Sequence, residues 1–175
     1  MKLKNILATA LIPFNILLLF FLIFSNQLVI PTWLQVLGRM HPLILHFPIV
    51  LVLIYFVIVL LAPKKITSES WYIEITEWLL LSAAFTAVIT SLMGLLLSRE
   101  GGYDADSITA HKYTGTITSF ILFIIYFSRN FLEQKQILFK LSAACAAFII
   151  IWAGHLGGDI THGENFVLAP VHLHM

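Results

Sequence analysis

Two histidines stand close together where a long apolar run begins, in the segment Gly38-Arg39-Met40-His41-Pro42-Leu43-Ile44-Leu45-His46-Phe47-Pro48. Histidine at a membrane span is rare and tends to be functional, because imidazole can bind a metal or carry a proton. Three further histidines, His111, His155 and His162, stand near the ends of other apolar segments. These five side chains are therefore the candidates for cofactor chemistry, provided that the fold brings them together.

The composition indicates an integral membrane protein. The chain has 175 residues, of which 59% are hydrophobic and 11% are charged, whereas soluble domains are about half apolar and about a quarter charged. A net charge of +1 gives no reason to expect a nucleic acid as partner. The single cysteine, Cys145, excludes an internal disulfide, and the sequence has no Cys-x-x-Cys-His motif for covalent haem attachment.

Five apolar segments are long enough to cross a bilayer, and we place them at about residues 6–24, 42–61, 75–97, 108–127 and 137–153. This pattern predicts an all-α membrane protein with a four-helix transmembrane bundle and an additional N-terminal transmembrane helix. The expected parts are an N-terminal anchor or uncleaved signal (1–28), a four-helix membrane domain (33–167) and a tail (168–175).

Several residues should shape the spans. Pro48 leaves the carbonyl of Ile44 without its usual partner, so we expect a bend just beyond His46. Asp106 or Ser107 should cap the fourth span. The glycines between positions 154 and 158 should break the fifth helix.

The basic residues indicate an orientation. Most lysines and arginines collect on the side that holds the N-terminus, which predicts a multi-pass protein of the bacterial inner membrane with a cytoplasmic N-terminus and an extracytoplasmic C-terminus. Because successive spans alternate in direction, the five candidate histidines should gather at the outer face. This convergence favours a cofactor or metal site over five separate structural histidines.

Haem fits such a site, because it needs axial imidazoles on facing helices, a flat apolar slot and cations for its propionates. His46 and His111 each lie about five residues into a span, so we expect them at similar depth and assign them to the iron of a haem b. Gly115, one turn below His111, leaves room for the macrocycle edge. Arg39 and Arg99 lie just outside the apolar zone, where we expect them to hold the propionates.

His41 differs from His46 by roughly 140° around a regular helix, so both should not bind one iron. It is expected to be a propionate partner, a proton carrier or a ligand of a second site with His155 or His162. The number of haems therefore stays at one or two. His172 and His174, at the chain end, are assigned no role.

Zinc or copper is the alternative cofactor, since imidazole suits both metals. His155 and His162, with Asp159 or Glu164, can supply an external mononuclear site. The corresponding alternative function is a non-redox membrane subunit or a zinc- or copper-binding module. No nucleophile motif is present, so we expect an electron carrier or a redox-complex subunit rather than a stand-alone enzyme, with a quinone as a further candidate partner.

The His-Pro-x-x-x-His-Phe-Pro block at 41–48, with His111 opening a later span and Gly154-His155-Leu156-Gly157-Gly158-Asp159-Ile160-Thr161-His162-Gly163 near the end, resembles a bacterial family of uncharacterised four-helix membrane proteins. The resemblance covers roughly Trp33 to Val167, with matching positions at His41, His46, His111 and His162. Members of that family are found beside c-type cytochrome or Rieske iron–sulfur domains, or fused to them. This association implies electron transfer with a separate partner of that kind. The core also resembles transmembrane b-type cytochromes.

Overall fold

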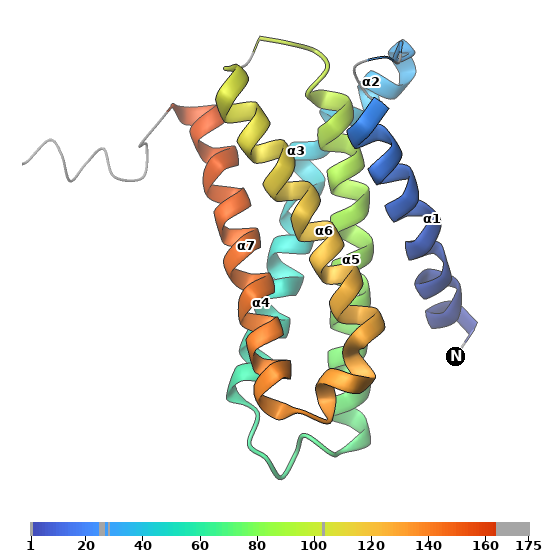
Figure 1. Ribbon diagram of the computed structural model, residues 1–175, viewed down its shortest axis with the longest axis vertical. Coiled ribbons are helices and arrows are strands. Elements are labelled where there is room, and N and C mark those ends of the chain that lie inside the picture. Colours follow the sequence, from blue (N-terminus) through green and yellow to red (C-terminus); the bar gives the residue numbers. More distant parts are fainter. Residues whose placement is uncertain (1, 25–26, 28, 103, 164–175) are drawn as a thin grey trace, which may run out of the picture.

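The computed structural model describes residues 2–24, 27, 29–102 and 104–163. The described residues form seven helices and no strand (Figure 1). Five helical segments are long and apolar enough to cross a membrane: Lys2–Phe24, Thr32–Leu61, Ser70–Leu97, Ala105–Glu133 and Gln136–His162. The prediction of an all-α membrane protein is therefore confirmed. The predicted domain limits stay a prediction, and the tail at 168–175 lies outside the described residues.

Four helices form an antiparallel bundle: α4 (His46–Leu61), α5 (Ser70–Leu97), α6 (Ala105–Glu133) and α7 (Gln136–His162). Helices α5 and α7 each contact both α4 and α6, so the four helices close a ring. Small side chains permit this close approach, and the buried alanines on α5 and α7 are Ala83, Ala84, Ala87, Ala143, Ala146, Ala147 and Ala153.

Helix α1 (Lys2–Phe24) lies outside this ring, mainly against α5 (Figure 1). Its buried residues are Leu11, Asn15 and Leu18, which are spaced so that they share one face of a helix. Phe14 meets Phe85 of α5 edge to face, with ring centres 5.7 Å apart. The first span is thus a packed helix of the structure.

The second span is interrupted twice. Helices α2 (Thr32–Arg39), α3 (His41–Ile44) and α4 follow one another, with Met40 and Leu45 outside the helices. Pro48 has no N–H to donate to the carbonyl of Ile44, and the second interruption directly follows Ile44. This interruption comes just before His46, at a residue with helical backbone angles (φ −58°, ψ −24°), and the bend expected just beyond His46 stays a prediction.

Two predicted helix ends are wrong. Helix α6 begins earlier than expected, because the carboxylate of Asp104 accepts the backbone N–H of Ser107 at 2.9 Å. This hydrogen bond also holds the pKa of Asp104 below its usual value. Helix α7 does not break at Gly154 but continues to His162. An unbroken helix keeps its backbone groups bonded where no water is available.

Candidate cofactor site at the histidine end

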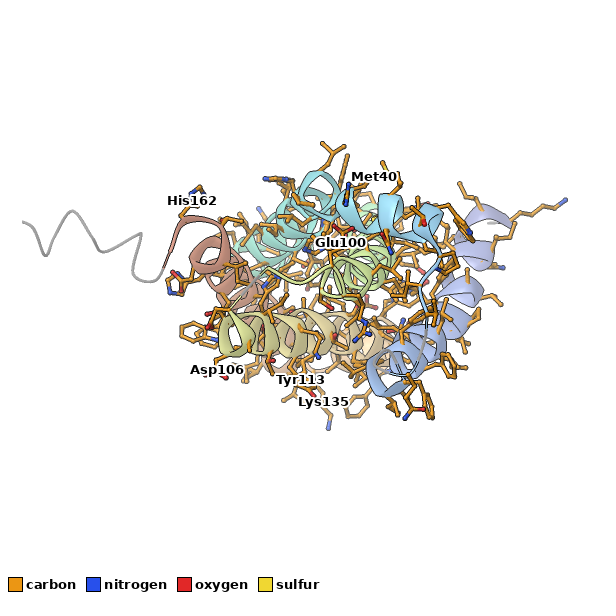
Figure 2. All side chains as sticks on the ribbon, turned by 90° about the horizontal axis from the view of Figure 1, so that it is seen from above. Met40, Glu100, Asp106, Tyr113, Lys135 and His162 are labelled. Carbon is orange, nitrogen blue, oxygen red and sulfur yellow. The ribbon has the colours of Figure 1, made fainter. Side chains whose placement is uncertain are left out.

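The alternation of chain direction brings the histidine-bearing segments to one end of the bundle. There α4 and α6 begin and α5 and α7 end, at the top of Figure 1. We call this the histidine end. Figure 2 looks down on it and shows His162 at the outer edge of α7.

At the centre of the histidine end, His41 of α3 faces His111 of α6. Their ring centres are 6.0 Å apart and the ring planes meet at 76°. His41 Nδ1 lies 2.9 Å from the carbonyl oxygen of Thr90, and His111 Nδ1 lies 2.9 Å from the carbonyl oxygen of Ala153. A carbonyl only accepts, so each Nδ1 carries the hydrogen and donates it. Each neutral imidazole then keeps a lone pair on Nε2, the form that binds a metal.

Two glycines allow neighbouring helices to press against these rings. A Cβ atom on Gly94 of α5 would lie 3.0 Å from Cε1 of His41. A Cβ atom on Gly157 of α7 would lie 3.0 Å from Cε1 of His111. Each ring is therefore held between a backbone carbonyl and the bare backbone of a glycine, which restricts its rotation.

A cavity of about 630 Å³ opens beside this pair, among α3 to α7. That volume falls within the range of roughly 300–1,000 Å³ that cofactor and small-molecule sites occupy. The walls are mainly apolar, and a Cβ atom added to Gly115 would meet nothing within 4 Å. The space is therefore suited to a large apolar ring beside the two imidazoles.

The other candidate histidines hold different positions. His46 lines the cavity and is exposed, but the ring that faces His111 is that of His41. His162 also lines the cavity. His155 does not, and its Nε2 lies 3.6 Å from a carboxylate oxygen of Asp159. Three residues named from the sequence lie outside the described part of the chain: Glu164, His172 and His174.

The cations are also arranged differently from the expectation. Neither Arg39 nor Arg99 lines the cavity, and Nε of Arg39 lies 3.0 Å from both carboxylate oxygens of Glu100. The sequence interpretation missed Lys112, which does line the cavity. The signal was available, because Lys112 shares a helix face with Gly115 and directly follows His111.

A site built only from protein ligands finds little support. Within the described residues, no three histidines, cysteines or carboxylates gather closely enough to hold a metal ion. Structural zinc takes four ligands and catalytic zinc usually takes three. Haem differs because its macrocycle supplies the equatorial ligands and the protein adds one or two. A pair of imidazoles beside a large apolar cavity is therefore better matched to haem.

Comparison with known proteins identifies the family. Residues 39–165, most of the chain, match the family model described as "Predicted membrane protein (DUF2231)". The chain belongs to this family, and the resemblance stated above to an uncharacterised membrane protein family is confirmed. No curated protein and no solved structure matches the chain.

Proposed function

We propose that this member of the DUF2231 family is an electron-transfer protein that holds one haem b between His41 and His111. The observation that carries the proposal is the facing pair of imidazoles, each with its Nδ1 bonded to a backbone carbonyl. A hydrogen bond of this kind fixes the orientation of a ligating ring and raises its basicity. Bound haem would supply a one-electron couple at its iron.

The spacing of the pair is consistent with this role. The rings of His41 and His111 face each other with centres 6.0 Å apart, and each would present its Nε2 to the iron of bound haem. The apolar walls of the cavity would exclude water and favour the less charged, reduced state.

The proposal replaces His46 by His41 in the expected axial pair. His46 lies in a different helix from His41, and the break at Leu45 separates the two. No hydrogen bond from a backbone carbonyl orients the His46 ring in the part of the chain that the structure describes. His46 is instead placed at the exposed edge of the cavity.

Orientation and partners complete the proposal. The excess of basic residues on the side of the N-terminus supports an extracytoplasmic histidine end in the cytoplasmic membrane. A haem at that end would exchange electrons with an extracytoplasmic redox protein, such as a c-type cytochrome or a Rieske protein. The side chains of this chain would bind and orient the cofactor and keep water from it.

An optical spectrum of the purified full chain in detergent, with haem and metal analysis, tests the proposal. We expect sharp α and Soret bands in the reduced-minus-oxidised difference and one haem per chain. A colourless protein with stoichiometric zinc or copper would overturn the proposal in favour of the metal-binding module. A protein that contains neither metal nor haem, and does not bind added haem, would overturn it as well.

A further inference from the structure

Charge is distributed unevenly over the cavity wall. Among the described residues that line it, Lys112 is the only lysine or arginine, and none is an aspartate or glutamate. Lys112 is half-buried along this apolar wall, and a cation there is stabilised by an opposite charge placed against it. Since the lining supplies no carboxylate, the ligand is the natural source of that charge.

The position of Lys112 suits this task. It lies on the cavity side of α6 with Ile108, Gly115 and Thr116, at the spacing of one helix face. Its ammonium nitrogen lies 5.3 Å from the ring centre of Tyr113, which points outward from α6 in Figure 2. Lys112 therefore lines the cavity while its charge lies beside Tyr113, and the flexible stem allows that charge to turn toward a ligand.

The arginines expected for this role are placed elsewhere. Arg39 is ion-paired with Glu100, and its side chain is 68% exposed. Arg99 does not line the cavity. The charge that can meet a ligand inside the cavity therefore comes from α6, one residue after His111.

From this we infer that Lys112 anchors an acidic group of the ligand, so that the cavity takes a flat apolar ring bearing a carboxylate. The inference rests on the proposed function in one respect, because it identifies that carboxylate as a propionate of haem b. The inference names Lys112 as the residue that recognises the acid. This recognition is distinct from the ligation by His41 and His111.

A reconstitution experiment tests the role of Lys112. The full chain, produced without haem, is titrated in detergent with haem and with haem dimethyl ester, which keeps the iron and ring but lacks the two negative charges. The Soret absorbance gives both dissociation constants. We expect the wild type to bind haem about tenfold more tightly than the ester, a difference of about 1.4 kcal/mol. In Lys112→Met this preference should disappear.

Three further variants serve as controls. Lys112→Arg keeps the charge and should keep the preference for haem. Arg39→Gln removes a cation that lies outside the cavity and should also keep it. Lys112→Gln provides a second neutral side chain should Lys112→Met fail to fold, and size-exclusion elution checks the folded state of each variant.

The outcomes separate the inference from the function on which it rests. Equal affinity for haem and ester in the wild type would overturn the inference while the proposed function stands. A preference that survives in Lys112→Met or Lys112→Gln would overturn the assignment to Lys112. Failure of the wild type to bind either compound would overturn the proposed function and, with it, the identification of the acid.

Discussion

The two ends of the bundle both place polar side chains among apolar helices, but they satisfy them in opposite ways. At the histidine end, two imidazoles bond to backbone carbonyls beside a large cavity. At the other end, Glu77 of α5 accepts a hydrogen bond from Lys4 of α1 at 2.6 Å and also pairs with Arg129 of α6. Arg129 in turn lies 3.6 Å from Glu133. We call this second group the ionic end.

The difference distinguishes a polar group that serves the packing of the helices from one that can bind a ligand. At the ionic end, two cations meet two carboxylates from three helices, so each charge is compensated by another side chain of the same group. Such a group stabilises a particular packing and offers little to a ligand. At the histidine end, each imidazole retains a nitrogen beyond its bond to the backbone. Intramembrane polar groups of that kind indicate function.

The largest expected effect comes from removing either central imidazole. His41→Ala or His111→Ala should abolish the haem spectrum, a greater loss than the roughly 10–100-fold that removing a residue which only orients a ligand costs. His46→Ala should retain the spectrum, because its ring is not one of the facing pair. Haem content after purification measures this.

The matched control is His155→Ala, since His155 lies at the same end but does not line the cavity. It should bind haem as the wild type does. Loss of haem in His46→Ala together with full retention in His41→Ala would restore the pair His46 and His111 that was expected from the sequence. The contrast between the two ends of the bundle would then rest on His46 in place of His41.

A smaller effect is expected at the ionic end, on stability rather than on the cofactor. Glu77→Gln leaves Lys4 and Arg129 without their shared carboxylate, although their side chains are only 20% and 16% exposed. Breaking a buried ion pair costs about 3–5 kcal/mol, and these pairs should fall near the lower limit because they are partly exposed. Thermal unfolding in detergent measures the loss.

Glu74→Gln is the control for this change, because Glu74 is an exposed carboxylate one turn away on the same helix. It should leave the unfolding temperature nearly unchanged. Folded Glu77→Gln protein should bind haem normally. Weakened haem binding there would show that the two ends are coupled and would remove the contrast between them.

The smallest effect is expected from two neighbouring glycines. Gly158→Ala should stabilise α7 by up to about 1 kcal/mol, because alanine favours a helix and the added Cβ meets nothing within 4 Å. Gly157→Ala should lose that gain and about 1 kcal/mol more, since its Cβ would press against His111. Unfolding curves of both variants measure the difference, and equal stabilities would argue against a tight contact at His111.

The spans and their alternation could be predicted because both follow from properties of the sequence itself. Long apolar runs fix the helices, and alternation then brings His41 and His111 to one end. The cap of α6 was misplaced because Asp104 and Asp106 are chemically equivalent, and only the backbone distinguishes the capping position.

The facing pair of imidazoles could not be predicted for two physical reasons. His46 was chosen for its depth in the span, and depth alone does not say which ring turns toward His111; that ring is the one of His41. The bonds that orient His41 and His111 end on backbone carbonyls, which leave no mark in the sequence. In a soluble protein, glycines like those of α7 indicate a turn. In this membrane helix they provide a flat helix face, which their spacing at 154, 157 and 158 could have indicated.

The link between Lys4 and Glu77 has a consequence for how this protein is made. The two residues stand 73 positions apart, and α1 lies outside the range that matches the family. Synthesis proceeds from the N-terminus, so α1 reaches the bilayer before its counter-ion on α5 has left the ribosome. Lys4 therefore has no Glu77 to pair with until α5 has been made, so docking of α1 against α5 follows the synthesis of both helices.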